Sequence, residues 1–236
     1  MIDRRKFITI TGASLSSAFL AACDSRGPKA AERLLRYAER KNEGLERALF
    51  RHTSMDAPVA GARAAGNALP SYFISKTVPV WNEQERGLWQ LELGGLVERP
   101  MNLTLANLVD MPRTHTRVNH YCVEGWTAVE QWTGVKLSDL AKLVGAKPEA
   151  KYIDFESFDS GYHESWDIES AMHPQTVVAY GLDGHMLGPA HGAPARVFSP
   201  VKLGYKNTKY LTRIMFLPNR TGGYWSDRGY EWYAGT

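Results

Sequence analysis

The chain has 236 residues, 44% hydrophobic and 22% charged, which is typical of a folded chain with a full core and argues against disorder. Its formal net charge of +3 at pH 7 is too weak to indicate nucleic acid as a partner. Seven Trp, eleven Tyr and eight Phe favour a strand-rich core or an aromatic ligand pocket over a helical bundle.

The first 22 residues carry the features of an export signal. The pair Arg4-Arg5 precedes an apolar run of small residues, which resembles a twin-arginine signal, the address of proteins that are exported already folded. The run is too short and too rich in Ser, Thr and Gly to span a membrane, which needs about 20 mainly apolar residues. Residues 1–22 are therefore predicted to be removed.

Leu20-Ala21-Ala22-Cys23 resembles a bacterial lipobox, in which the cysteine receives a lipid and becomes the new N-terminus. Asp24, directly after it, resembles the signal that keeps lipoproteins in the inner membrane. An ordinary secretory signal with an incidental cysteine is the alternative. We expect a protein exported by the twin-arginine route and held on the periplasmic side of the bacterial inner membrane only by a lipid on Cys23.

Residues 29–52 are predicted to form an amphipathic helix, because Leu34, Leu35, Leu45 and Leu49 recur near helical spacing. The stretch from Met55 to Pro70 is full of Ala, Gly and Pro, which indicates a linker. The expected organisation is a signal at 1–22, an anchored helix and linker at 23–68, a folded domain at 69–220 and a surface tail at 221–236.

Alternating patterns and turn residues predict that strands dominate the domain. Strands are expected at 89–93, before a turn at Gly94-Gly95, and at 116–122, 151–158, 176–180, 195–198 and 210–217. Short helices are expected at 104–109, capped by Thr104, and from a Ser138 cap to Leu143 before Gly145. Because helices and strands do not alternate regularly, the predicted fold class is α+β, with mixed sheets and short helices.

Cys122 lies mid-chain in Asn119-His120-Tyr121-Cys122-Val123-Glu124-Gly125-Trp126 and is the only cysteine besides Cys23. A lone thiol in an exported protein has no disulfide partner within the chain. Packing, a bridge to another chain, nucleophilic catalysis and metal ligation remain open for it. Packing as a small buried side chain is the commonest of these roles.

Several common chemical motifs are absent from the sequence. There is no Cys-x-x-Cys or His-Glu-x-x-His zinc pattern, no phosphate-binding P-loop and no dinucleotide-binding glycine pattern. A Cys-His-Asn protease trio can be drawn from Cys122, but such trios occur by chance in most sequences.

Three cationic side chains near glycine turns form a pattern suited to phosphate. His191 and Arg196 flank the turn in Gly188–Val197, and Lys209 follows thirteen residues after Arg196. Arginine offers two parallel donors, lysine a point charge, and a glycine turn free amides. Each side chain alone is more often a solvated surface cation.

Together these motifs resemble the sulfite oxidase family of molybdopterin-dependent oxidoreductases, near the branch of the periplasmic methionine-sulfoxide reductase catalytic subunit. The resemblance covers roughly residues 69–217. The motifs that carry it are Cys122-Val123-Glu124-Gly125-Trp126, Ala171-Met172-His173-Pro174, His191-Gly192-Ala193-Pro194-Ala195-Arg196 and Gly204-Tyr205-Lys206 through Lys209.

The resemblance implies one molybdenum and a single pterin per chain, with the Cys122 thiolate as metal ligand and Tyr162 beside the metal as a hydrogen-bond or proton donor. A buried core tyrosine is the alternative for Tyr162. The other implied cofactor-binding residues are Phe73, Ile74, Ser75, Lys76, Thr77, Ser157, Asp159, His191, Arg196, Asn207, Thr208 and Lys209.

The chain departs from the sulfite oxidases at the substrate side. Ser75 and Lys76 stand where they carry a sulfite-binding arginine, and Val123-Glu124-Gly125 replaces Ala-Gly-Asn after the ligand cysteine. His191, in contrast, matches the sulfite oxidases rather than the sulfoxide-reductase branch. The chain thus resembles an intermediate branch.

The predicted function is oxygen-atom or two-electron transfer on a small sulfoxide, N-oxide or sulfur oxyanion. The alternatives are a sulfite-type oxidase that passes electrons to a cytochrome, and a non-catalytic molybdopterin-binding lipoprotein. Because the sequence has no Cys-x-x-Cys-His haem motif, electrons are expected from a separate membrane or soluble cytochrome, or from a quinone-linked protein.

Overall fold

The computed structural model describes residues 29–49, 54–60 and 69–236. The predicted signal, Cys23 and the linker residues 50–53 and 61–68 lie outside the described residues. The chain divides into two units, residues 1–46 and 47–236. Most of helix α2 (Lys29–Leu49), the predicted amphipathic helix, belongs to the first unit. In the described part of the chain, no helix is both long and apolar enough to cross a membrane.

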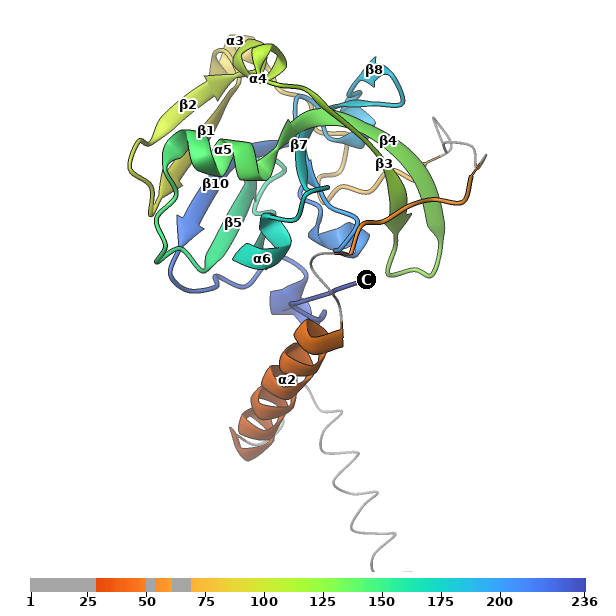
Figure 1. Cartoon of the computed structure of the whole chain (residues 1–236), viewed down its shortest axis with the longest axis vertical. Coiled ribbons are helices and arrows are strands. Elements are labelled where there is room, and N and C mark those ends of the chain that lie inside the picture. The colour runs from red at the N-terminus through yellow and green to blue at the C-terminus, as the bar shows by residue number, and fades with distance from the viewer. Residues whose placement is uncertain (1–28, 50–53, 61–68) are drawn as a thin grey trace, which may run out of the picture. The chain divides into compact units, whose positions relative to one another are not determined.

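The first sheet of the second unit has five strands in the order β2-β1-β10-β5-β6. Its strands are β1 (Gln90–Gly95), β2 (Met101–Thr104), β5 (Tyr152–Ser157), β6 (His163–Asp167) and β10 (Leu211–Leu217). The pair β1–β10 is parallel and the other pairs are antiparallel, so the sheet is mixed, as predicted (Figure 1).

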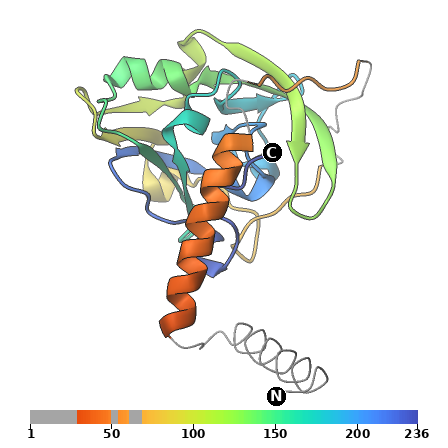
Figure 2. The same ribbon diagram turned by 60° about the horizontal axis from the view of Figure 1, so that its bottom comes forward.

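The second sheet follows the order β3-β4-β7-β8, with β9 paired to β7. Its strands are β3 (Thr114–Tyr121), β4 (Thr127–Lys136), β7 (Val177–Leu182), β8 (His185–Met186) and β9 (Arg196–Phe198). Strands β3 and β4 form a long curved hairpin at the edge of the unit (Figures 1 and 2).

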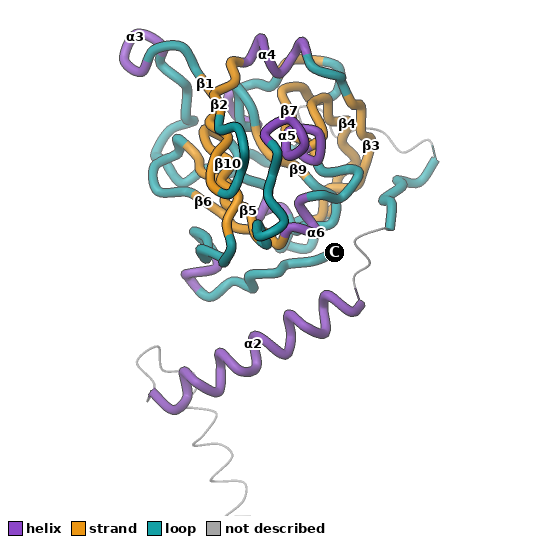
Figure 3. The backbone as a smooth tube through the Cα atoms, turned by 60° about the vertical axis from the view of Figure 1, so that its left-hand side comes forward, coloured by secondary structure: helices purple, strands orange, loops and turns teal. Residues whose placement is uncertain are grey.

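The helices of the second unit are short, and loops connect most strands (Figure 3). They are α3 (Glu83–Arg86), α4 (Leu105–Asp110), α5 (Leu137–Val144), α6 (Ile168–Ala171) and the 3₁₀ turns η2 (Pro189–His191), η3 (Gly204–Lys206) and η4 (Ser226–Arg228). Two sheets with short helices confirm the predicted α+β class.

The core has two parts, one for each sheet. The larger packs Leu93, Ile153 and Ile214 of the first sheet against Leu140 of α5. The smaller lies on the second sheet, where Trp132 stacks on Phe198 with ring centroids 4.7 Å apart. Burying such side chains contributes about 1.5–3 kcal/mol each, so both clusters hold the strands that carry the site.

Of the predicted helix caps and turns, one cap is confirmed, and one cap and one turn were wrong. Thr104 caps α4 as predicted, since its hydroxyl accepts the Asn107 N–H at 3.2 Å and the Asn107 side chain accepts the Thr104 N–H. The Ser138 cap was wrong: α5 begins at Leu137, whose N–H donates to the Thr176 carbonyl, so a neighbouring strand end replaces the cap. The turn at Gly94-Gly95 was also wrong, because both glycines lie in β1 beside β10.

The ten-residue strand β4 was not predicted. It contains Gly134, which normally weakens a strand. Here the chain needs glycine, because a Cβ at this position would overlap the Val178 carbonyl oxygen of β7. The pairing of β4 with β7 shifts register between Thr133 and Gly134.

Candidate functional site

The hairpin of β3 and β4 presents Cys122 at its tip. The Gly125 N–H donates to the Cys122 carbonyl at 3.0 Å, and the Cys122 N–H donates to the Trp126 carbonyl at 3.0 Å. Gly125 has a φ of 87°, the left-handed conformation that such a short hairpin loop requires and that glycine adopts without strain. The sequence Cys-Val-Glu-Gly-Trp therefore folds into a tight loop with the thiol at its start.

Cys122 is a free, half-buried thiol. Its burial raises the pKa of the thiol, while the backbone N–H groups of Glu124 and Val123 act to lower it. Within the described residues, no group of three or more His, Cys, Asp or Glu side chains is arranged to hold a metal ion. What Cys122 offers a metal is one sulfur, which is a strong donor for a soft metal once the thiol is deprotonated.

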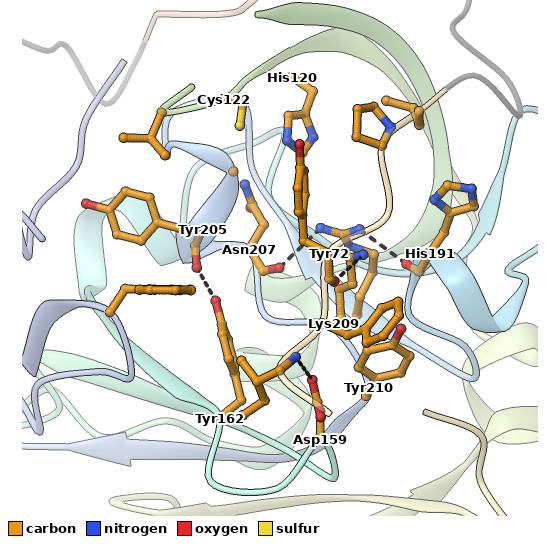
Figure 4. Close-up of a pocket in the computed structure, with 18 of the residues that line it drawn as sticks. Tyr72, His120, Cys122, Asp159, Tyr162, His191, Tyr205, Asn207, Lys209 and Tyr210 are labelled. Carbon is orange, nitrogen blue, oxygen red and sulfur yellow. Dashed lines mark hydrogen bonds between the residues drawn. The ribbon is translucent and has the colours of Figure 1, made fainter. Parts of the chain in front are cut away.

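A cavity of about 320 Å³ opens beside Cys122, between the two sheets and the segments that cover them (Figure 4). Of the residues predicted from the sequence, those lining the cavity are Phe73, Ile74, Cys122, Ser157, Asp159, Tyr162, His191, Arg196, Asn207 and Lys209. Ser75, Lys76, Thr77 and Thr208 do not line it. His173, from the motif Ala171-Met172-His173-Pro174, does not line the cavity either, and its Nε2 lies 2.9 Å from the Ser54 carbonyl oxygen.

Arg196 is buried at the start of β9, and its guanidinium lies over the Trp132 ring, 4.8 Å from the centroid. It donates to the backbone carbonyls of His191 at 3.2 Å and Asn207 at 3.1 Å, and its Nε has no partner. Burial lowers the pKa of the guanidinium, which remains charged because its usual pKa is above 12.

Lys209 is the second cation of the cavity and is half-buried. Its ammonium donates to the carbonyls of Tyr72 at 2.8 Å and Ala190 at 3.0 Å. Burial, then the charge of Arg196, lowers the pKa of Lys209 to about 7. Burial also lowers the pKa of His191, with Lys209 and Arg196 adding to the effect.

These residues suit an anionic phosphate. Among the described residues, no carboxylate pairs with Arg196 or Lys209, although a buried cation such as Arg196 is normally paired. Three buried polar atoms in the same region also lack partners: Arg196 Nε, Thr208 Oγ1 and Tyr210 OH. With Cys122 in the same cavity, the donor set fits a phosphate-bearing molybdopterin whose metal binds one protein thiolate.

A segment that we call the strap, Leu69–Ser75, lies along the cavity. Asp159 holds its C-terminal end, accepting the N–H groups of Ile74 at 2.7 Å and Ser75 at 3.0 Å and the Ser75 hydroxyl. Lys209 holds its middle at the Tyr72 carbonyl. Asp159 and Ser75, predicted as cofactor contacts, are thus first of all contacts of the strap.

Tyr162 lines the cavity, but its hydroxyl donates to the Tyr205 carbonyl (Figure 4). Burial and the nearby Glu164 charge raise its pKa well above the usual value, so the phenol stays protonated. Asn207 is likewise engaged: its side chain accepts the Ser199 N–H at 2.8 Å and donates to the Lys202 carbonyl at 3.2 Å.

Several residues of the cavity were not predicted from the sequence. The polar and aromatic ones are Tyr72, His120, Glu124, Trp126, Glu130, Trp132, Tyr205, Tyr210, Trp225 and Tyr230. His120 could have been found, because residues two apart on a strand share a face and it precedes Cys122 by two. Its partner is Glu130, whose Oε2 lies 3.2 Å from His120 Nδ1. This contact depends on the register of the hairpin, so Glu130 could not have been found from the sequence.

Glu124 contacts two side chains at the entrance of the cavity. Its carboxylate accepts the Tyr72 hydroxyl at 2.5 Å and the Trp126 indole N–H at 3.1 Å. The hydrogen bond from Tyr72, then that from Trp126, lowers the pKa of Glu124. A negative charge therefore stands two residues after Cys122.

Comparison with known proteins gives a consistent result. The model of the family described as oxidoreductase molybdopterin binding domain matches residues 76–225. The chain is 39% identical over 154 residues to the putative protein-methionine-sulfoxide reductase subunit YedZ1 of Azospira oryzae, covering 65% of this chain and 58% of that protein.

A second relative is the protein-methionine-sulfoxide reductase catalytic subunit MsrP of Ralstonia nicotianae, 33% identical over 153 residues that cover 58% of this chain and 46% of that protein. The chain spans about half the length of these two relatives. Among solved structures, the sulfane dehydrogenase SoxCD from Paracoccus pantotrophus matches with a TM-score of 0.56 and 25% identity, over 62% of this chain and 41% of that one.

Proposed function

Because the chain belongs to the family of oxidoreductase molybdopterin binding domains, we propose that it is a molybdenum-cofactor enzyme that reduces a small sulfoxide. The observation that carries the proposal is one cavity that contains the Cys122 thiol and two cations without carboxylate partners, the buried Arg196 and the half-buried Lys209. One group that bears both a metal and a phosphate satisfies both features.

The chain's own residues would hold the cofactor at two places. Arg196 and Lys209, with His191 beside them, would bind the phosphate through charge-assisted hydrogen bonds. The Cys122 thiolate would bind the molybdenum. When bound, the cofactor supplies a centre that accepts and donates two electrons.

The charges around Cys122 support an uncharged substrate over an oxyanion such as sulfite. Arg196 and Lys209 bind the backbone carbonyls of His191 and Ala190, whereas the loop of Cys122 carries the Glu124 carboxylate. A negative charge beside the Cys122 loop repels an anion, although its exposure to water weakens the effect. The names of the two relatives, both protein-methionine-sulfoxide reductase subunits, point to the same substrate class.

Reduction of a sulfoxide consumes two electrons and two protons and yields a thioether and water. The electrons would come from a separate redox protein, such as a membrane cytochrome or a quinone-linked protein. Tyr162, whose phenol is held protonated, would donate a hydrogen bond to the substrate by exchanging its present bond to the Tyr205 carbonyl. Export by the twin-arginine route, with a lipid on Cys23 at the periplasmic side of the inner membrane, would place the enzyme next to such a partner.

The test is the metal and pterin content of the exported protein, measured beside Cys122→Ser and followed by turnover. We expect one molybdenum and one pterin per chain in the wild type, an altered metal spectrum in the variant, and oxidation of a reduced dye that depends on a sulfoxide. Sulfite-dependent reduction of a cytochrome, without sulfoxide turnover, would support the sulfite-type oxidase instead. Wild type without molybdenum or pterin from a cofactor-producing host would end the proposal.

A further inference from the structure

The C-terminal segment adds an aromatic wall to the cavity. Trp225 and Tyr230 line it together with Tyr205 of η3. The ring centroids of Trp225 and Tyr230 are 5.0 Å apart, and those of Tyr230 and Tyr205 are 5.3 Å apart. We call these three side chains the aromatic wall. The family match ends at residue 225, so Tyr230 lies beyond it.

The wall is held in place by buried polar contacts rather than by regular secondary structure. Glu164 of β6 accepts the Trp225 N–H at 3.1 Å and binds the Lys206 ammonium at 2.5 Å. Lys206 is the neighbour of Tyr205 in η3, and the Tyr205 hydroxyl donates to the Glu231 carbonyl. One ion pair therefore fixes both sides of the wall.

The wall stands on the Cys122 side of the cavity. Gly204, which begins η3, approaches His120 so closely that a Cβ there would lie 2.6 Å from its Nε2 and 3.5 Å from the Tyr121 carbonyl oxygen. These two residues directly precede Cys122. In Figure 4, Tyr205 and Cys122 lie on one side of the cavity, and Lys209 and His191 lie on the other.

The wall offers ring faces and no Lys or Arg side chain. Ring faces attract polarisable sulfur and apolar alkyl or aryl groups, by about 0.3–1.5 kcal/mol for a sulfur contact. Tyr230 is 41% exposed, so its ring has a free surface for a ligand. Glu124, on the Cys122 loop, adds a charge that disfavours anions.

Resting on the proposed sulfoxide reduction, we propose that the aromatic wall is the specificity-determining surface of the site. Trp225, Tyr230 and Tyr205 bind the apolar substituent of an uncharged sulfoxide and of its thioether product. Bulky apolar sulfoxides are therefore preferred to small ones such as dimethyl sulfoxide. The wall acts on binding and not on the electron transfer itself.

The test compares methyl phenyl sulfoxide with dimethyl sulfoxide as substrates of the metal-loaded enzyme. In Tyr230→Ala, KM for methyl phenyl sulfoxide is expected to rise about tenfold, with the effect on KM rather than kcat, and KM for dimethyl sulfoxide is expected to change much less. Tyr230→Phe, which keeps the ring, is expected to have the wild-type ratio of KM for methyl phenyl sulfoxide to KM for dimethyl sulfoxide. Tyr37→Ala, an exposed tyrosine in helix α2, is the matched control.

A second measurement does not depend on turnover. Binding of methyl phenyl sulfide is followed by saturation-transfer NMR to wild type, Tyr230→Ala and Tyr37→Ala of equal metal content and melting temperature. Weaker binding only in Tyr230→Ala supports the wall, and unchanged binding with an unchanged KM ratio overturns it. A wild type that holds molybdenum and binds the sulfide, yet reduces no sulfoxide, overturns the proposed function and leaves the wall standing.

Discussion

The Lys206 ammonium lies 2.5 Å from a carboxylate oxygen of Glu164, and both side chains are fully buried. Burial raises the pKa of Glu164 and lowers that of Lys206, while each charge acts on the other in the opposite direction. Through this pair, β6, η3 and the C-terminal segment are joined at one point. Glu164 also accepts the Trp225 N–H, and Lys206 follows Tyr205 in η3, so the pair is linked to two residues that line the cavity.

Removal of one partner of this pair is expected to destabilise the protein strongly. Glu164→Gln or Lys206→Met leaves an uncompensated buried charge, which costs about 3–5 kcal/mol of unfolding free energy. The double variant Glu164→Gln/Lys206→Met is expected to lose less than the sum of the single variants. Denaturant unfolding measures the free energy of unfolding of the wild type, the two single variants and the double variant. Lys142→Met, in the exposed pair with Asp139, is the control and is expected to change stability by less than about 0.5 kcal/mol.

Loss of the Arg196 guanidinium is expected to abolish retention of the cofactor. Arg196→Met removes the charge but keeps a buried, apolar stem beside Trp132. Molybdenum and pterin content after gel filtration should fall at least tenfold, while Lys142→Met retains both. Arg196→Lys keeps the charge without the planar donors, so an intermediate content is expected. Full retention in Arg196→Met would remove this residue from the proposed phosphate site.

The pH dependence of stability in the cofactor-free protein is expected to report Lys209. Its folded pKa of about 7 lies below the unfolded value near 10.4, so the unfolded chain binds more protons between these pH values. The destabilising contribution is full below pH 7 and disappears as the pH rises towards 10. Relative to Lys209→Met, the wild type should therefore gain unfolding free energy over this interval.

Bound phosphate reverses the effect, because an anion beside Lys209 raises its pKa. Inorganic phosphate, used as the probe, is expected to be bound with proton uptake near pH 8, measured by calorimetry in two buffers of different ionisation enthalpy. The absence of proton uptake in the wild type, with phosphate bound, would contradict the assignment of Lys209.

Gly134→Ala is expected to disrupt the second sheet. The added Cβ meets the Val178 carbonyl of β7, and its three nearest atoms are all β7 backbone, which cannot move aside as a flexible side chain could. A loss of about 2–4 kcal/mol is expected, measured by thermal unfolding. Gly188→Ala is the control, because nothing lies within 4 Å of its Cβ position, and it should be neutral or slightly stabilising.

Tyr162→Phe is expected to weaken both folding and turnover. It removes the hydrogen bond to the Tyr205 carbonyl, which costs about 1–3 kcal/mol if that carbonyl remains dry. Because Tyr162 is proposed to donate a hydrogen bond to the substrate, its replacement is also expected to lower kcat, with the molybdenum content unchanged. Unchanged kcat in a fully loaded variant would reduce Tyr162 to a structural residue.

The sequence was informative where chemistry depends on residue type and order. Cys122 lies far in the chain from His191, Arg196 and Lys209, yet the family resemblance of their motifs predicts that they share one site, and the structure brings them to one cavity. The strands that bury a regular apolar pattern, such as β5 and β10, were predicted to within a few residues.

What the sequence did not indicate depends on contacts between distant segments. Glu130 contacts His120 only because of the register between β3 and β4. Strand β4 was not predicted because it contains Gly134, a residue that is unfavourable in most strands but is required here by the close approach of β7. The C-terminal segment was expected to be a surface tail, but its Trp232 and Tyr233 are buried. The Trp232 indole N–H donates to the Ser165 hydroxyl, and the Tyr233 carbonyl accepts a hydrogen bond from Lys202. Both partners are distant in the sequence, so no local pattern predicts these contacts.

The strap contains no helix or strand, yet it forms part of the cavity lining. Asp159 and Lys209 hold it along the cavity, at Ile74 and at Tyr72, and the Tyr72 hydroxyl donates to Glu124. The position of this part of the lining therefore depends on three side chains from distant parts of the sequence and not on the pairing of the strap with a sheet.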